Sequence, residues 1–199
     1  MFTHECVGHL SLNLTHMINI APPQYLQKLA RGRNVLLLLA LFIAFTGFIM
    51  PTMEADIKAL SGGVGVLDLE FFYAPEKAHS MLSAYGSEGI RLYLFAQWSV
   101  DFVFPVISGL FIALCLLWIG AKRWWWLGVL LTLADWTENI FVTMLLVQFP
   151  EFSTPVALTS CAFTMLKWST IFFANGLILF HGGKKLLAKR KMRLEQSRL

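Results

Sequence analysis

One apolar stretch of the chain, residues 124–147, carries two carboxylates and an amide near its middle. Asp135, Glu138 and Asn139 are spaced i, i+3 and i+4, so all three face the same way on a helix. An apolar helix of this length is typical of a membrane span, where an acid is tolerated only if it faces protein or a water-filled cavity. The stretch therefore predicts a polar site inside a bundle of membrane helices.

Composition supports the same interpretation. The 199 residues are 57% hydrophobic and 14% charged, whereas soluble domains carry about 25% charged residues. We therefore expect an integral, multi-pass membrane protein whose length suits one compact helical bundle. The net charge is +4, and the Lys and Arg residues lie mainly at the span ends. Membrane topology explains this placement better than binding to a polyanion, so we expect no nucleic-acid partner.

Four apolar runs predict an all-α, four-transmembrane-helix bundle. The first run is short and is expected to end at Pro51. Its basic flank resembles a signal sequence, but no small-x-small cleavage site follows, so we interpret it as an uncleaved anchor. The predicted segments are an N-terminal segment 1–33, a transmembrane domain 34–181 with spans at about 34–51, 92–119, 124–147 and 155–180, a loop 52–91 between the first two spans, and a basic tail 182–199.

Lys and Arg are distributed unevenly between the two sides of these spans. Twelve of them lie in the terminal segments and in the Lys122–Arg123 turn, whereas only Lys58, Lys77 and Arg91 lie in the long loop. The positive-inside rule then places both termini in the cytoplasm and the loop outside it, in a cell inner or plasma membrane or an organelle membrane. The basic tail favours contact with anionic lipid headgroups, and fixing the topology explains its charge equally well.

The loop between the first two spans is expected to have structure of its own. Pro75 opens a predicted helix over Glu76–Tyr85 that ends at Gly86. The preceding stretch, Val66–Tyr73, alternates partly between apolar and acidic side chains. A loop of this length is typical of a lid over a site, and shielding of the span ends is an equal alternative. The apolar stripe of the predicted helix consists of Ala78, Met81, Leu82 and Tyr85.

Helix geometry gives the depth of the charged residues. Pro105 is expected to kink the second span and to release the carbonyl of Asp101. Counted from the outer ends, Asp101 and Glu138 lie roughly 14 Å deep, and Asp135 and Lys167 roughly 18 Å deep. We therefore expect an ion pair between Lys167 and Asp135, and a proton-sharing pair of Asp101 and Glu138 with no countercharge. These four side chains are the candidate catalytic residues.

Residues near these acids are candidates for binding a ligand, and no metal or cofactor follows from the pattern. His4, Cys6 and His9 match no structural zinc spacing, so we expect no metal site. No histidine lies within a span, which argues against haem held between helices, and the cofactor stays open. The candidate ligand-binding residues are Gln97, Trp98, Trp136, Asn139 and Trp168.

Three functions fit these features. The leading hypothesis is a site that binds, and in an enzyme converts by acid–base chemistry, a small amphipathic or lipid-like molecule. The first alternative is a proton- or ion-coupled transporter or channel, acting as a homo-oligomer because four short spans enclose little volume. The second is a structural subunit or assembly factor that docks through its apolar first span, since buried ion pairs also hold membrane helices together.

The predicted architecture is similar to that of the emopamil-binding and sigma-2-type group of sterol isomerases and receptors. The features in common are four spans, cytoplasmic termini, a long outer loop after the first span, and acids on inner helices. The resemblance is one of architecture, and no residue role follows from it.

Overall fold

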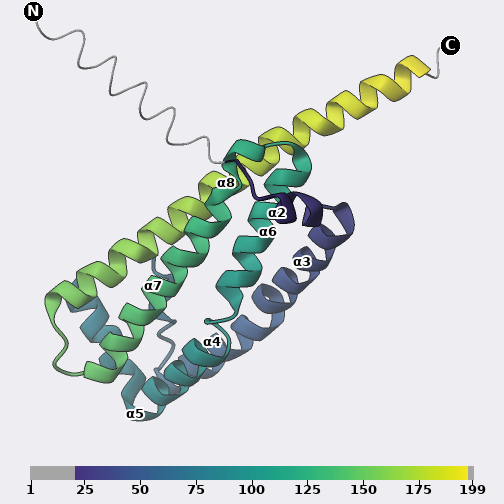
Figure 1. Cartoon of the computed structure of the whole chain (residues 1–199). Coiled ribbons are helices and arrows are strands. Elements are labelled where there is room, and N and C mark those ends of the chain that lie inside the picture. Colours follow the sequence, from purple (N-terminus) through teal and green to yellow (C-terminus); the bar gives the residue numbers. More distant parts are fainter. Residues whose placement is uncertain (1–20, 197–199) are drawn as a thin grey trace, which may run out of the picture.

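The computed structural model describes residues 21–196, and every regular element over this range is helical. Three helices are long and apolar enough to cross a membrane, and the bent pair α5–α6 makes a fourth if it is counted as one span. The prediction of an all-α chain with several spanning helices is therefore confirmed, and Figure 1 shows these helices side by side. In chain order the elements are α2 (Gln24–Leu29), α3 (Gly32–Ala44), the π-helical turn η1 (Phe45–Ile49), α4 (Met50–Leu60), the 3₁₀ turn η2 (Leu67–Leu69), α5 (Pro75–Ser99), α6 (Phe104–Ile119), the 3₁₀ turn η3 (Lys122–Trp124), α7 (Trp126–Gln148) and α8 (Thr154–Gln196).

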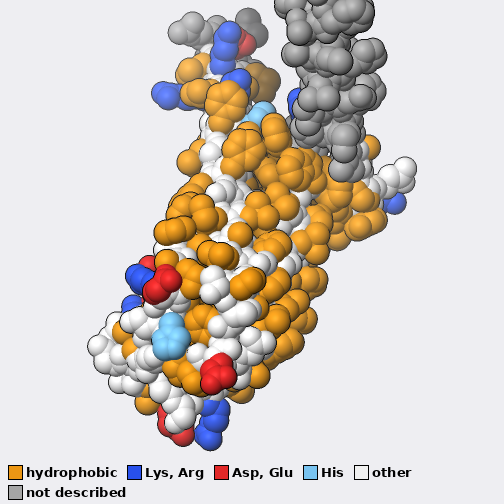
Figure 2. Space-filling view, turned by 90° about the vertical axis from the view of Figure 1, so that its left-hand side faces the viewer, with side chains coloured by type: hydrophobic (Ala, Val, Ile, Leu, Met, Phe, Trp, Pro, Cys, Tyr) orange, Lys and Arg blue, Asp and Glu red, His pale blue; other side chains and the backbone are white. Residues whose placement is uncertain are grey.

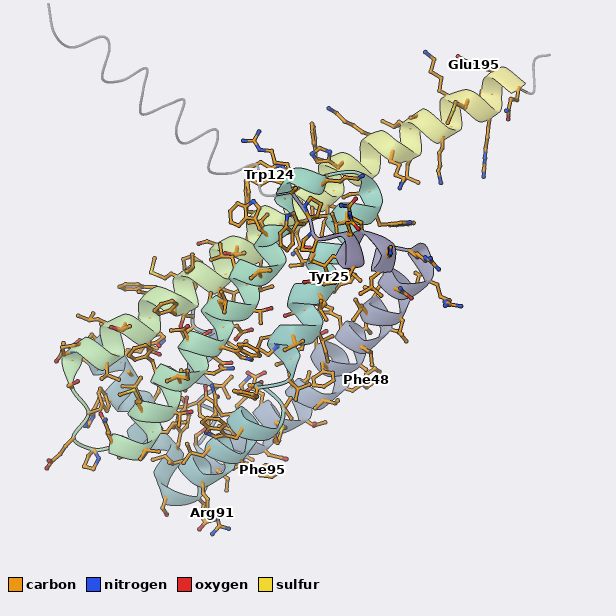
Figure 3. All side chains as sticks on the ribbon, viewed as in Figure 1. Tyr25, Phe48, Arg91, Phe95, Trp124 and Glu195 are labelled. Atoms are coloured by element: carbon orange, nitrogen blue, oxygen red, sulfur yellow. The ribbon has the colours of Figure 1, made fainter. Side chains whose placement is uncertain are left out.

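The bundle has two chemically distinct ends and an apolar flank. Tyr25 and Trp124 lie at one end, which we call the tail end, and Arg91 lies at the opposite end, the loop end (Figure 3). Between the ends, Phe48 and Phe95 project outward and are 69% and 63% exposed. Figure 2 shows that hydrophobic side chains cover most of one flank, with charged side chains toward its ends. An exposed apolar band of this kind is expected where lipid surrounds a protein.

The first apolar helix does not end at Pro51, where the sequence predicted its end. It runs from Gly32 to Leu60 through α3, η1 and α4. The π-helical turn accounts for this continuity, because the amide of Met50 donates to the carbonyl of Phe45, five residues back, and the helix widens just before the proline. Pro51 then lies at the beginning of α4, where the fixed φ of proline is tolerated.

The helix pair α5–α6, over which the second span was predicted, is bent by 42° at the break between the two helices. Pro105 lies at the start of α6. The carbonyl of Asp101, four residues earlier, accepts a hydrogen bond from Asn139 Nδ2 of α7 at 2.7 Å. The kink and the released carbonyl predicted from Pro105 are therefore confirmed.

The connection between α4 and the second span folds onto α7 and α8 at the loop end. The predicted helix begins at Pro75 as the first half of α5 and is interrupted at Gly86, whose φ of +60° favours a residue without a Cβ. Its apolar stripe packs into the loop-end core, as its 3.6-residue spacing requires. Ala78, Met81, Leu82 and Tyr85 are all at most 5% exposed.

The partly alternating stretch before α5 forms no strand. It makes the single 3₁₀ turn η2, which buries Leu67, while Tyr73 further along is buried against α8. Leu69 and Phe72 between them remain 50% and 64% exposed. The partly alternating pattern therefore corresponds to two buried residues, Leu67 and Tyr73, with an exposed segment between them.

The last helix, α8, continues far beyond the bundle. Its 43 residues measure about 64 Å at 1.5 Å per residue, whereas the hydrocarbon core of a membrane is about 30 Å thick. The sequence predicted a span over 155–180 and a separate basic tail, but α8 has no break between them, and Gly182 and Gly183 are helical. In Figure 1 the C-terminal portion of α8 projects away from the bundle at the tail end.

Candidate functional site

A cavity of about 270 Å³ lies within the bundle, lined by residues of the first helix, α6, α7 and α8, of η2, and of the break between α5 and α6. Most of its lining side chains are apolar, among them Phe42, Phe104 and Leu131. Its ionisable lining residues are Asp68, Asp101, Asp135 and Lys167. A mainly apolar wall with a few polar groups is the usual make-up of a small-molecule site.

Lys167 forms ion pairs with two acids of α7. The nearer acid is Glu138, whereas the sequence predicted Asp135 as the partner. Its Nζ lies 2.6 Å from Glu138 Oε2 and 3.8 Å from Asp135 Oδ1. Thr164, one turn earlier on α8, donates to the other carboxylate oxygen of Glu138 at 2.7 Å. The expected contact of Lys167 with Asp135 is present, but the expectation that Glu138 has no countercharge is wrong. Asp135 and Glu138 are separated by three residues, so one ammonium between them reaches both.

Asp101 is the acid that this ion-pair cluster leaves out. Its backbone carbonyl is fixed by Asn139, while its side chain lines the cavity. Within residues 21–196, the carboxyl of Asp101 has no hydrogen bond to, or ion pair with, another protein group. Of the three acids Glu138, Asp135 and Asp101, Glu138 is tightly paired, Asp135 is loosely paired, and Asp101 has no partner among the described residues.

Asp68 of η2 closes the loop-end side of the cavity, and sequence reasoning missed its role. Its backbone carbonyl accepts hydrogen bonds from Lys167 Nζ at 3.2 Å and Trp168 Nε1 at 3.3 Å. The Tyr93 hydroxyl donates to its carboxylate at 2.8 Å and accepts from the amide of Leu67 at 3.1 Å. The available signal was an acid between two leucines in the loop. Its partners lie 25 and 99 positions away in the sequence, which periodicity cannot detect.

A chain of hydroxyl groups continues from Glu138 toward the loop end. Tyr73 donates to Ser160 Oγ at 2.7 Å, and Ser160 lies one turn before Thr164 on α8. Burial raises the pKa of Tyr73 to about 12, so the phenol stays protonated and remains a donor at neutral pH. These contacts fix the segment before α5 to α8, behind the cavity wall.

Four of the five predicted ligand-binding residues do not line the cavity. They surround a separate hollow of about 10 Å³ beside the α5–α6 break, whereas Trp168 lines the cavity. Residue counting gives the depth of a side chain but not its direction around the helix axis. The four residues at the separate hollow are Gln97, Trp98, Trp136 and Asn139.

These polar residues stabilise the broken span. Asn139 donates to the Asp101 carbonyl and accepts from Gln97 Nε2, both at 2.7 Å. Trp136 Nε1 donates to the carbonyl of Phe102 at 2.9 Å. Since a carbonyl released by a helix break needs a new partner in an apolar environment, this face of α7 stabilises the geometry that directs Asp101 to the cavity.

We expect Asn139→Ala to destabilise the protein by about 2–3 kcal/mol, because it leaves the Asp101 carbonyl and the Gln97 amide without partners. Thermal unfolding in a mild detergent, followed by circular dichroism, measures this as a lower midpoint by about 5–10 °C. The matched control is Asn175→Ala, since Asn175 is exposed and its amide only donates to the Ile171 carbonyl of its own helix. Equal midpoints for the two variants contradict the proposed role of Asn139.

The described residues contain no cluster that suits a metal ion: within 21–196, no group of three or more His, Cys, Asp or Glu side chains is placed to ligate one. His4, Cys6 and His9 lie outside the described residues. No family model matches the sequence, and searches of curated proteins and of solved structures found no match. The architectural resemblance to the emopamil-binding and sigma-2-type group gains no support from these comparisons.

Proposed function

We propose that this chain is a four-span membrane protein that binds a small amphipathic or lipid-like molecule in the central cavity, with Asp101 as its polar contact. The observation that carries the proposal is the unpartnered carboxyl of Asp101 in a mainly apolar cavity of about 270 Å³. A carboxyl inside an apolar site is unfavourable unless a ligand, water or a proton satisfies it. The other acids of the site already have protein partners.

The lining of the cavity supports access from the bilayer. It includes Thr46 of η1 and Asn175 of α8, and both are exposed at the surface of the bundle. The first helix packs mainly on α6, while α8 packs mainly on α7. The space between the first helix and α8 is therefore the side on which an apolar molecule reaches the cavity directly from lipid.

The charged groups have separate tasks in this proposal. Glu138 neutralises Lys167 and holds its ammonium in place. Asp101 and Asp135 both line the ligand space, and two carboxyls in one site suit acid–base chemistry because one donates a proton while the other accepts it. Conversion of the ligand by proton transfer would then use Asp101 and Asp135, in place of the pair Asp101 and Glu138 expected from depth alone.

The distribution of Lys and Arg supports an orientation with the tail end in the cytoplasm. Twelve of these residues lie in the terminal segments and the Lys122–Arg123 turn, against three between Lys58 and Arg91. The projecting portion of α8 then extends into the cytoplasm, where its basic residues favour anionic headgroups near the membrane surface.

Asp101→Asn is expected to abolish ligand retention without loss of stability. The carboxyl has no protein partner in the part of the chain that the structure describes, so the amide is expected to leave the fold intact. Losing a charge-assisted hydrogen bond is expected to weaken ligand binding by about 10- to 100-fold. The measurement is native mass spectrometry of protein gently extracted from its own membrane. We expect one small molecule per chain in the parent and a largely apo mass in the variant.

The matched control is Glu88→Gln, which makes the same chemical change at an exposed acid of α5 and is expected to retain the ligand. An apo mass for the parent, or equal ligand retention by Asp101→Asn, overturns the proposal. In either case proton flux in liposomes becomes the next measurement, since a proton- or ion-coupled transporter needs the same acids without a resident ligand.

A further inference from the structure

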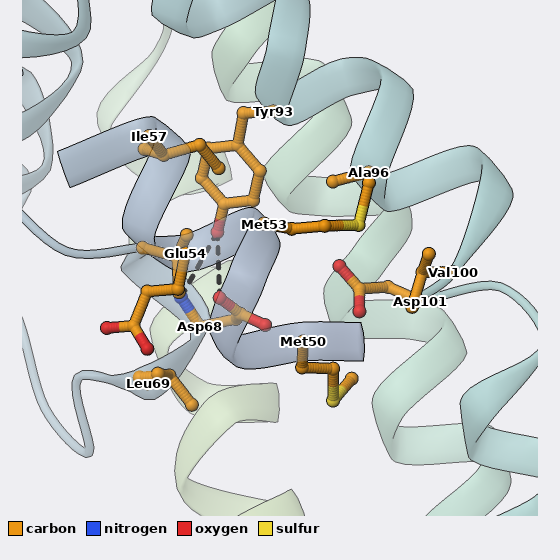
Figure 4. A pocket seen from close by; sticks show the side chains of 11 residues that line it. Met50, Met53, Glu54, Ile57, Asp68, Leu69, Tyr93, Ala96, Val100 and Asp101 are labelled. Carbon is orange, nitrogen blue, oxygen red and sulfur yellow. Dashed lines mark hydrogen bonds between the residues drawn. The ribbon is translucent and has the colours of Figure 1, made fainter. Parts of the chain in front are cut away.

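A second, smaller cavity of about 60 Å³ lies between α4, η2 and α5. Figure 4 shows its lining, in which the Tyr93 hydroxyl bonds Asp68. The carboxyls of Asp68 and Asp101 point toward one another across the hollow, and Glu54 lies on the side away from Asp101. The function proposed above makes no use of this cavity.

The two cavities follow one another along the bundle. Both are lined by Met50, Asp68, Leu69 and Asp101. The remaining residues of the smaller cavity lie further toward the loop end, because on the first helix they follow Met50 and on α5 they precede Asp101 by up to two turns. They include Met53, Glu54, Ile57, Tyr93 and Ala96. The four residues in common therefore separate an outer cavity from the central one.

The outer cavity has the size and the polar groups that water needs. The cavity volume of about 60 Å³ exceeds the ~10–15 Å³ that one water needs, and each water needs two or more polar partners. Among the described residues, the Asp101 carboxyl has no protein partner, and the Asp68 carboxylate accepts only from Tyr93. Glu54 is partly exposed and paired with Lys58 at 2.7 Å. The route thus begins at a charged surface and ends at an unsatisfied acid.

We propose that the outer cavity is an aqueous inlet through which protons pass between the solution at the loop end and the carboxyl of Asp101. A proton arrives through water, binds one oxygen of the Asp101 carboxylate, and returns to water by the same route. The inlet rests on the role of Asp101 in the proposed function. It gives protons a route that is separate from the route of the ligand. The apolar ligand uses the side between the first helix and α8, and protons use the loop end.

The charges around Asp101 suit a proton route. Asp68 of η2 and Glu54 of α4 face the outer cavity, and Tyr93 of α5 is its neutral hydroxyl. On the central side Asp135 and Lys167 line the cavity, and Glu138 behind them is paired with Lys167. The described lining of the outer cavity therefore contains three acids and no Lys, Arg or His, and Lys58 is paired only with Glu54. The remaining negative charge favours a hydrated proton or another small cation over an anion.

The test measures whether aqueous silver ion, a small thiol-reactive cation, reaches a cysteine placed in the outer cavity. Ala96→Cys is the reporter, since Ala96 lines this cavity and is only 4% exposed. The protein is held in lipid nanodiscs, exposed to silver for different times, denatured, and labelled with a fluorescent maleimide. We expect the reporter to be protected at least about tenfold faster than a buried control, because an ion does not enter a dry apolar core.

The buried control is Ala157→Cys, at a position in the loop-end core that is 0% exposed and lines neither cavity. The parent, which contains Cys6, Cys115 and Cys161, gives the background, and its Cys115 and Cys161 are buried. Val100→Cys, also in the outer cavity, is a second reporter if the first does not fold.

A blocking substitution identifies the route. Met53→Trp fills the outer cavity, and combined with the reporter it is expected to slow protection to the rate of the buried control. Equal slow protection of Ala96→Cys and Ala157→Cys overturns the inlet, and so does fast protection that Met53→Trp leaves unchanged. Because none of these readouts involves a ligand, failure of the inlet is distinguished from failure of the ligand site, which the mass spectrum of Asp101→Asn reports.

Discussion

Gly128→Ala is expected to destabilise the protein by about 3 kcal/mol or more, which is the upper range for overpacking. A Cβ on Gly128 lies 2.1 Å from the carbonyl oxygen of Gly109 and 2.9 Å from the side chain of Ala113. The neighbours are mainly backbone, which cannot rotate away, so α6 and α7 must separate. Thermal unfolding in mild detergent is expected to show a midpoint lower by about 10 °C or more, or the protein fails to accumulate in the membrane.

The opposite glycine provides an independent test of the same contact. A Cβ on Gly109 lies 2.0 Å from Thr132 Oγ1 and 2.5 Å from the Gly128 carbonyl, so Gly109→Ala is expected to have a similar effect. The matched control is Gly176→Ala in α8, where a Cβ meets nothing within 4 Å and the backbone is helical. That change is expected to be neutral or slightly stabilising, since alanine favours a helix more than glycine does. Equal midpoints for Gly128→Ala and Gly176→Ala contradict the close packing of α6 and α7.

The contact between α6 and α7 matters for the site because it places two of its acids. Asp101 shortly precedes α6, and Asp135 lies two turns after Gly128 on α7. Small residues at a helix contact let backbones approach closely, which is the usual device for packing helices in lipid, where no hydrophobic effect drives them together. Separation of the two helices is therefore expected to reduce ligand retention as well as stability.

Local periodicity was enough to predict those features that depend on one helix at a time. The apolar stripe from Ala78 to Tyr85 is buried as its spacing requires, and Pro105 releases the Asp101 carbonyl as proline sterics require. Two predictions within single helices failed: α8 continues past Gly182 and Gly183 without a break, and the first helix continues past Pro51. The sterics of proline predicted that the helix ends at Pro51. A π-helical turn just before it instead lets the helix continue, and the local sequence does not distinguish a continuous helix from a break.

Counted depth brought Asp101, Asp135 and Lys167 to one cavity, but it gave neither the pairing of the charges nor most of the other lining residues. Depth along each helix placed Asp135 and Lys167 together, and the two do meet at 3.8 Å. Depth also grouped Glu138 with Asp101, yet Glu138 turns toward Lys167 and Asp101 toward the cavity. Rotation about the helix axis depends on how the bundle packs, which is a property of several helices together. Asp68 was missed for the same reason, since a loop residue acquires its role only from distant partners.

Glu138→Gln is expected to destabilise the protein by about 3–5 kcal/mol, as loss of one partner of a buried ion pair does. Its side chain is fully buried and Lys167 is 7% exposed, so the ammonium would keep Asp135 at 3.8 Å as its acid partner, together with the Asp68 carbonyl at 3.2 Å. Unfolding in mild detergent at neutral pH measures the change. The contrast with Asp101→Asn is the most informative result, because the same acid-to-amide change at an unpartnered carboxyl is expected to leave the midpoint within about 2 °C.

A double substitution distinguishes the free energy of the ion pair from the effect of changing the shape of its site. Lys167→Met alone leaves Glu138 buried with Thr164 as its remaining partner, and is expected to be about as destabilising as Glu138→Gln. Together the two changes remove both charges, so the double variant is expected to lose clearly less than the sum of the single losses. Additive losses would show that Lys167 acts mainly through its bond to the Asp68 carbonyl, and thus through closure of the cavity by η2. A strong coupling energy instead assigns Lys167 and Glu138 to the framework of the site, which leaves Asp101 and Asp135 as the acids free to act on a ligand.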